Sequence, residues 1–381
     1  MLGTMWERVV GQERAIGVLE RAAARPVHAY LLVGPSGSGV EDAARCFAAS
    51  LLSAVSDGGS PKGSGVSADR DEARRADLVL RGVHADVVEF EPEGVSILAA
   101  QVTEIIKEAS RSPVESERKV LIVFDADRLN ETAANKLLKT LEEPPERTHI
   151  VLVTGSPDDL LPTIRSRCQR IDLDPVRSDV VRDALVRAGA GAEAADLAAG
   201  LAGGHLARAR SLVGHLAPLR AEFAAAPARV DGSGGTAHVV AADLEAAVEA
   251  AVASVEARHE QEQKTFEADI ERLGYAGRDA QRLRKRLEER QKRESRRARI
   301  DALEEGVTAI ETVYRDSLAT PAPPLNTDRS PVAVHARAAA AALDACRDAR
   351  QALAMNEKGA LHIQHLLLRL PPAGGGPALT R

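Results

Sequence analysis

The stretch with the clearest chemical meaning is a loop that carries three closely spaced glycines, Gly34, Gly37 and Gly39. It follows an apolar run, and its backbone amides could point at the phosphates of a nucleotide. A working phosphate-binding loop continues with a Lys, which neutralises phosphate charge, and a Ser or Thr, which holds Mg²⁺. Val40 and Glu41 occupy those two positions. The glycines therefore predict the loop geometry, while the side chains that nucleotide chemistry needs are missing.

Asp125 is the second candidate, because it follows the strongest apolar run of the chain, 119–124. A carboxylate at the end of such a strand can hold Mg²⁺ through water. A hydrolytic ATPase places a second carboxylate directly after it, but Ala126 stands there and Asp127 comes one residue later. A lone Asp at a strand end is more often a turn or cap residue. The loss of three required groups argues against hydrolysis, and Glu41 would also repel a phosphate.

Two arginines flank Ser166 near the end of a short helical stretch. Arg165 and Arg167 are suited to stabilising phosphate charge in a neighbouring active site, as an arginine finger supplied in trans. From residue type alone, a surface ion pair is the favoured alternative for each of them. Cys168 is interpreted as a small buried apolar side chain.

Weaker signals lie further along the chain. Thr154 follows an apolar strand and could sense a γ-phosphate, although a Thr at a strand end is usually structural. Arg208 and Arg210 could act as nucleotide sensors, with ordinary exposed arginines as the favoured alternative.

The elements that must position these side chains alternate between strand and helix over residues 28–174. Apolar runs predict strands at 30–33, 85–90, 119–124, 149–153 and 170–173. Helical spacing predicts helices at 13–24, 42–52, 99–110, 130–142 and 160–167, and Pro144 and Pro145 end the fourth of these. This alternation favours an α/β domain, with a parallel sheet and helices on both faces.

Beyond Pro175 the pattern is helical. We expect an α/β domain at 1–175, a small helical domain at 176–216, an all-helical domain at 217–371 and a disordered tail at 372–381. Segments 226–235 and 320–330 are expected to be looser connections. The Ser/Gly-rich segment 53–70 is expected to be a flexible loop.

A charged helical stretch at about 238–317 contains a basic part. Residues 271–300 include 12 Lys/Arg and 5 Asp/Glu, and residues 290–297 include no apolar side chain. We interpret 258–300 as a helical extension or hairpin that projects into solvent, either as an ordinary solvated projection, which is favoured, or as a basic finger for nucleic acid or an acidic partner.

Overall composition excludes several classes of protein. The chain has 381 residues, 44% of them hydrophobic, and a net charge of −6, so it is no obvious nucleic-acid binder as a whole. Three distant cysteines suggest neither disulfides nor zinc, and fit a reducing cytosol. No apolar run reaches about 18 residues and the first residues lack an apolar signal region, so we expect a cytoplasmic protein without membrane spans.

Several blocks together resemble one family: VVGQERA (9–15), HAYLLVGPSGSG (28–39), GVHADV (82–87), NKLLKTLEEPPERTHIVLVT (135–154) and LPTIRSRCQ (161–169). They are similar to the bacterial clamp-loader subunits of the AAA+ class, and most of all to the delta-prime branch of that DNA polymerase III family. The pairing of LLKTLEEPP with SRC is highly specific. The resemblance is strong over about 5–175, moderate to 216 and weak beyond.

This resemblance implies an AAA+ domain, a helical lid and a collar whose last helix is 362–371. Val40, Glu41 and Ala126 imply a non-catalytic stator that binds no nucleotide, while ATP and Mg²⁺ occupy the neighbouring motor subunits. Arg167 would be the arginine finger. Implied partners are motor (tau/gamma) and delta subunits in a hetero-pentamer, and through it the sliding clamp and primer–template DNA.

Two alternatives stay open: an active tau/gamma-like motor subunit, and a DNA-binding scaffold that works through 271–300. The family often binds zinc after the loop helix, but 53–81 contains no Cys, so no metal site is expected. The block 139–145 would form part of a subunit interface.

Overall fold

The computed structural model describes residues 5–53, 66–92, 96–318, 324–326, 328, 332–355 and 359–372. The chain divides into two compact units. Unit 1 comprises Met1–Ala184, Gly203–Ala207 and Tyr275–Leu287, and unit 2 comprises Leu185–Ala202, Arg208–Gly274 and Glu288–Arg381. Among the described residues, no helix combines the length and apolar character needed to cross a membrane.

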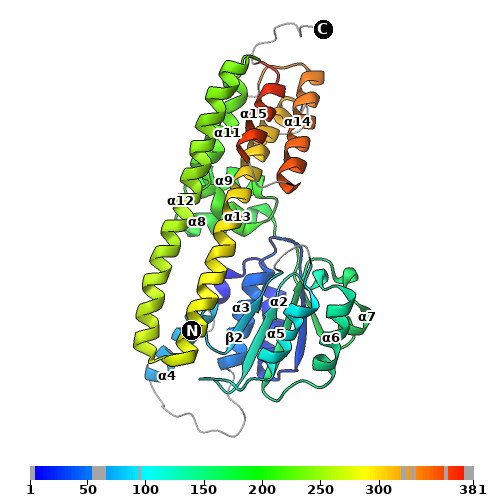
Figure 1. Cartoon of the computed structure of the whole chain (residues 1–381), viewed down its shortest axis with the longest axis vertical. Helices are drawn as coiled ribbons and strands as arrows, with labels where there is room; N and C mark the ends of the chain where they lie inside the picture. Colours follow the sequence, from blue (N-terminus) through cyan, green and yellow to red (C-terminus); the bar gives the residue numbers. More distant parts are fainter. Residues whose placement is uncertain are drawn as a thin grey trace. The chain divides into compact units, whose positions relative to one another are not determined.

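Unit 1 is built on a five-stranded parallel sheet (Figure 1). Its strands are β1 (Ala29–Val33), β2 (Val87–Phe90), β3 (Lys119–Val123), β4 (Thr148–Thr154) and β5 (Gln169–Asp172), in the order β2-β3-β4-β1-β5. Every residue of β1, β3 and β4 is buried, as their continuous apolar runs require of a sheet covered on both faces. The predicted parallel α/β sheet is confirmed.

Helices cover both faces of the sheet. Side chains such as Leu32 pack with α2 (Glu13–Ala24) and α3 (Val40–Ser53). Their neighbours, such as Leu31, point the other way and pack with α5 (Ala99–Ala109), α6 (Glu131–Glu142) and α7 (Pro162–Arg165). This alternation follows from the two-residue period of a strand. Three short 3₁₀ helices, η1 (Trp6–Arg8), η2 (Ala126–Arg128) and η3 (Pro157–Asp159), complete the unit's first 175 residues together with α4 (Val66–Leu80).

One expectation about these irregular segments changes. The segment 53–70 was expected to be a loop throughout, but α4 already begins at Val66 and packs against α3, which supplies the tertiary contact that a short helix needs. Residues 54–65 lie outside the described residues. The same holds for 373–381 of the expected tail and for most of 320–330.

Two buried carboxylates connect different segments of unit 1. Glu108 of α5 lies 2.7 Å from the Nζ atom of Lys119 and also pairs with Arg286 at 3.2 Å. Asp86 is fully buried and accepts three backbone N–H groups, from residues 114 to 116, at 2.5–2.9 Å. These bonds neutralise the carboxylates where water is excluded.

Unit 2 is helical, as predicted. Its main core is formed by α11 (Ala217–Arg229), α12 (Gly234–Leu273), α13 (Gly277–Leu318), α14 (Ala336–Met355) and α15 (Gly359–Arg369). The shorter α9 (Ala192–Ala202) lies entirely in this unit, while α8 (Ser178–Arg187), α10 (Leu206–Val213) and α13 each have residues in both units. The expected loose connection 226–235 is helical up to Arg229, and the stretch 238–317 is broken at Gly274, whose left-handed backbone ends α12.

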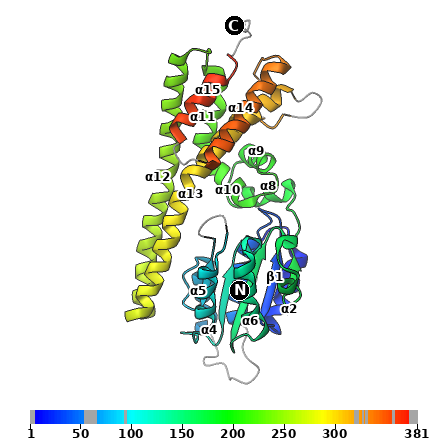
Figure 2. The same ribbon diagram turned by 45° about the vertical axis from the view of Figure 1, so that its right-hand side comes forward.

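The charged stretch forms a pair of adjacent helices held by ion pairs (Figure 2). The helix α12 carries 9 Asp/Glu and 3 Lys/Arg, so it complements the basic part of α13. Arg299 pairs with Glu245 and Glu249, and Arg290 pairs with Glu262. Arginines in the part of α13 that belongs to unit 2 therefore pair with carboxylates of α12, which favours a hairpin held by its own ion pairs over a free basic finger.

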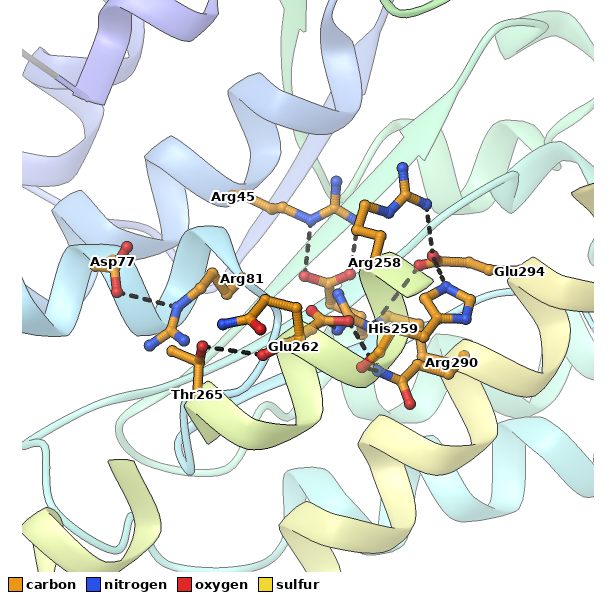
Figure 3. Close-up of polar contacts among 12 residues, drawn as sticks. Arg45, Asp77, Arg81, Arg258, His259, Glu262, Thr265, Arg290 and Glu294 are labelled. Carbon is orange, nitrogen blue, oxygen red and sulfur yellow. Dashed lines mark hydrogen bonds and ion pairs between the residues drawn. The ribbon is translucent and has the colours of Figure 1, made fainter. Parts of the chain in front are cut away.

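The predicted solvent projection of 290–297 is wrong in part. Figure 3 shows His259 facing Glu294, and their Nε2 and Oε2 atoms are 2.9 Å apart. Gln291 is only 9% exposed and donates to the His259 carbonyl oxygen at 3.2 Å. A polar layer thus fills the space between α12 and α13 where apolar side chains are absent, because buried polar groups persist when they are hydrogen-bonded.

Candidate functional site

The loop 34–39 leaves the sheet directly after β1. The Gly34 N–H donates to the Thr154 carbonyl oxygen at 3.1 Å, and the Ser38 N–H donates to the Pro35 carbonyl oxygen at 3.0 Å. Gly37 and Gly39 have φ angles of 86° and 82°, which glycine adopts readily and other residues do not. The three glycines thus build a tight turn at the carboxyl edge of the sheet, where ligands bind in open α/β folds.

Two of these glycines are also needed for close packing. A Cβ atom on Gly34 would lie 2.4 Å from the Ser38 hydroxyl oxygen. A Cβ atom on Gly37 would lie 2.4 Å from Cγ and 2.5 Å from Cα of His205. His205 belongs to the segment Gly203–Ala207 of unit 1, so this segment rests directly on the loop.

The side chain of Gln12 hydrogen-bonds to the backbone of the loop, and the sequence analysis did not identify this residue as part of the site. Its side-chain Nε2 donates to the Ser38 carbonyl oxygen at 3.1 Å and to that of Asp174 at 2.6 Å. Its Oε1 accepts from the Asp174 N–H at 3.0 Å. The side chain is nearly fully buried, as a hydrogen-bonded amide can be. The position of Gln12 within the block VVGQERA was the signal that the sequence offered.

The two substituted positions of the loop have different surroundings. Val40 is 3% exposed and belongs to the apolar core beneath the sheet, whereas Glu41 is exposed. The loop therefore offers backbone donors, but it has an apolar side chain where an ammonium would be and a carboxylate where a hydroxyl would be.

The strand-end residues meet in an unexpected pair. Thr154 is buried, and its hydroxyl donates to the Asp127 carboxylate at 2.5 Å while it accepts the Ser156 N–H at 3.0 Å. Asp127 comes one residue after the position of the second carboxylate of a hydrolytic ATPase. Asp125 has a left-handed φ of 48°, and its carboxylate lies 3.6 Å from the Arg128 Nε atom. Ala126 is fully buried.

Arg167 lies at the amino ends of the strands, whereas the loop 34–39 lies at their carboxyl ends. Arg167 precedes β5 by two residues, and the first residue of β5, Gln169, pairs with Tyr30 near the start of β1. The loop, in contrast, follows the last residue of β1. The length of β5, four residues at about 3.3 Å each, therefore separates Arg167 from the loop by more than about 10 Å along the strands.

The guanidinium of Arg167 is held by two partners. Its Nη2 atom is 2.6 Å from Oε1 of Glu142, and its Nη1 donates to the Thr163 carbonyl oxygen at 3.0 Å. Arg165 pairs instead with Asp158 at 2.6 Å. Burial raises the pKa of the adjacent Cys168 thiol to about 12, so it remains protonated and packs as a small apolar group.

The remaining candidates, Arg208 and Arg210, belong to unit 2. Arg208 pairs with Glu305 of α13 at 2.8 Å inside unit 2. Arg210 lies in the last turn of α10. Within the described ranges, no group of three or more His, Cys, Asp or Glu side chains is arranged to hold a metal ion.

Comparison with known proteins identifies similar chains. A family model described as DNA polymerase III, delta subunit, matches residues 11–177. The delta-prime subunit of DNA polymerase III from Bacillus subtilis is 36% identical over 159 residues, which are 42% of this chain and 46% of that protein. The tau subunit from the same organism is 34% identical over 181 residues, 46% of this chain and 30% of that protein. The chain thus spans about half the length, or less, of these curated relatives.

A solved structure of a DNA polymerase III gamma subunit-related protein from Thermotoga maritima aligns with 93% of this chain and 97% of that chain. The identity is 21% and the TM-score is 0.45.

Proposed function

We propose that this chain is a delta-prime-type subunit of a clamp loader, because its residues 11–177 match a family model described as DNA polymerase III, delta subunit. In this role it is a stator that hydrolyses no ATP. It supplies Arg167 in trans to the ATP site of a neighbouring motor subunit and so helps load a sliding clamp onto primed DNA. Its partners are tau/gamma-type motor subunits and a delta subunit in a hetero-pentamer.

The position of Arg167 is the observation that carries this proposal. Arg167 lies before the amino end of β5, and the glycine loop lies after the carboxyl end of β1, more than about 10 Å away along the strands. Arg167 therefore lies away from the place where the loop would bind the phosphates of a nucleotide on its own chain. An exposed arginine in this position is available to a phosphate that another chain presents.

The loop supports a role without hydrolysis. A γ-phosphate carries most of the charge that must be stabilised during transfer, and catalysis depends on cations placed around it. Val40 removes the ammonium and Glu41 adds an opposing charge, while Asp127 already accepts the Thr154 hydroxyl. We therefore propose that this chain binds no nucleotide and that ATP and Mg²⁺ are held by the motor subunits.

Arg167 would act electrostatically. Its planar guanidinium presents several N–H donors at fixed angles, which suits the oxygens of a transferring phosphoryl group. An arginine finger supplied in trans raises the rate by about 10³–10⁵ in well-studied phosphoryl-transfer enzymes. The effect appears in the hydrolysis rate, because the charge that it stabilises develops in the transition state.

The test is an Arg167→Ala substitution in the reconstituted complex, with ATP hydrolysis measured in the presence of clamp and primed DNA. We expect the ATPase rate to fall while the subunit composition, measured by size-exclusion chromatography, is unchanged. Arg170→Ala is the matched control, since Arg170 lies nearby on β5 and pairs with Asp172 at 2.8 Å. A wild-type rate for the Arg167 variant would remove the finger role.

The second candidate function is an active motor subunit, which the similarity to a tau subunit favours. Titration of the isolated chain with a fluorescent ATP analogue separates the two functions. Micromolar, stoichiometric binding that is abolished by a Gly37 substitution would support the motor and refute the stator in its strict form.

A further inference from the structure

The contact between Glu142 and Arg167 joins two residues that are 25 positions apart in the sequence. Glu142 is the last residue of α6, and Arg167 follows α7. We propose that Glu142 is a positioning residue for the arginine finger, holding the guanidinium in the orientation in which it meets a phosphate of the neighbouring subunit. This inference rests on the proposed function of Arg167.

The geometry restrains the guanidinium at two of its three nitrogens. Glu142 binds Nη2 at 2.6 Å, and the Thr163 carbonyl oxygen binds Nη1 at 3.0 Å. Each of these nitrogens carries two hydrogens, so each keeps an N–H for another acceptor. Two anchors on a planar group determine where its remaining donors point. A long side chain that is preorganised in this way loses less freedom when it binds a phosphate.

The carboxylate itself is held in place by the core. Leu141, which precedes Glu142, is 1% exposed, and Leu137 one turn earlier is fully buried, so the end of α6 cannot rotate freely. Pro144 and Pro145 follow and stop the helix. The carbonyl of Thr163 comes from the single turn of α7, whose orphan acceptors attract a cation.

The pairing is weak enough to permit function. The side chains of Glu142 and Arg167 are 46% and 37% exposed, and ion pairs in contact with water contribute little stability. A phosphoryl group with several charged oxygens, enclosed at a subunit interface, competes well against one solvated carboxylate. Glu142 therefore orients Arg167 without preventing its transfer of hydrogen bonds to a phosphate.

Two opposite effects of removing Glu142 can be distinguished. If Glu142 positions the finger, its loss lowers the hydrolysis rate, because fewer encounters place the guanidinium correctly. If Glu142 merely competes with the phosphate, its loss raises the rate. The matched control is Asp158→Ala, which removes the carboxylate partner of Arg165, the last residue of α7.

The experiment measures kcat and KM for ATP in the full reconstituted complex, together with its subunit composition. For Glu142→Ala we expect kcat to fall about two- to five-fold with KM unchanged, since an interaction realised in the transition state affects kcat. Glu142→Gln should restore most of the rate, because its amide oxygen still accepts the Arg167 N–H. Asp158→Ala should retain the wild-type rate.

A double-mutant cycle completes the test. In the Arg167→Ala background, Glu142→Ala should have no further effect, because the residue acts through the arginine. If Arg167→Ala lowers kcat but Glu142→Ala leaves it unchanged or raises it, the positioning role is wrong and the finger role survives. If Arg167→Ala itself has no effect, the proposed function fails.

Discussion

The packing of His205 on the glycine loop predicts a difference between two substitutions of the same type. Gly37→Ala and Gly39→Ala each place an alanine in the left-handed region, at φ angles of 86° and 82°. A Cβ atom at Gly39 meets nothing within 4 Å, whereas at Gly37 it would lie 2.5 Å from the backbone Cα of His205. Gly39→Ala is therefore a matched control that isolates the contact with His205.

The magnitude follows from two contributions to the free energy of unfolding. The left-handed backbone costs an L-residue about 1–2 kcal/mol, and this cost is shared by both variants. Gly37→Ala additionally pushes a backbone atom outward by about 1 Å to reach ordinary contact, and such overpacking costs about 1–3 kcal/mol. We expect Gly37→Ala to be less stable than Gly39→Ala by about 1–3 kcal/mol.

The assay is urea unfolding followed by tryptophan fluorescence. The chain contains a single Trp, Trp6, which is 5% exposed in the core of unit 1, so its emission reports the unfolding of that unit. Trimming the His205 side chain does not relieve the contact with Cα. The double variant Gly37→Ala, His205→Ala should therefore remain less stable than Gly39→Ala.

Equal midpoints for Gly37→Ala and Gly39→Ala would refute this reasoning. That result would mean that the segment Gly203–Ala207 does not rest on the loop in solution. It would leave the glycine turn itself intact, since both variants would still show the backbone cost.

Two further predictions concern the cores of the two units. Burial alone would raise the pKa of Glu108, but the Lys119 hydrogen bond and nearby cations lower this pKa below its ordinary value of 4.5. The ionised Glu108 therefore stabilises the fold fully above pH 4.5, and this contribution is lost as the pH falls through the lowered pKa. Glu108→Gln should lower the free energy of unfolding by about 3 kcal/mol at pH 7, because Lys119 is left buried without its charge partner. The substitution should also abolish this part of the pH dependence of unfolding monitored by Trp6 fluorescence. An unaltered dependence of stability on acid pH would contradict the prediction. In unit 2, a Cβ atom on Gly306 would lie 2.5 Å from the buried Phe223 ring, so Gly306→Ala should lower the free energy of unfolding by about 1–3 kcal/mol. Gly200 lies in a helix with open space around it, so Gly200→Ala should raise the free energy of unfolding by about 0.5–1 kcal/mol. Unfolding of both variants is followed by circular dichroism. Equal stability of these two variants would show that the ring moves aside.

The sequence alone determined most of the fold of the α/β region. Unbroken apolar runs can be buried only in a sheet covered on both faces, which is why β3 and β4 were predictable. The glycine spacing required a tight turn after β1, and the residues at 40 and 41 showed which chemistry that turn lacks. These inferences depend on neighbours in the chain, for which periodicity and residue type are sufficient.

Only the tertiary structure decided which side chains meet. Gln12 and Asp174 are 162 residues apart, and no local pattern joins them. The acidic α12 and basic α13 looked like one long charged stretch until the break at Gly274 placed them side by side. The same holds for the partners of Arg167: its residue type suggested a finger, but the pairing with Glu142 depends on where α6 ends in space. Such contacts are set by the packing of elements, because side-chain bonds act over about 3 Å regardless of sequence separation.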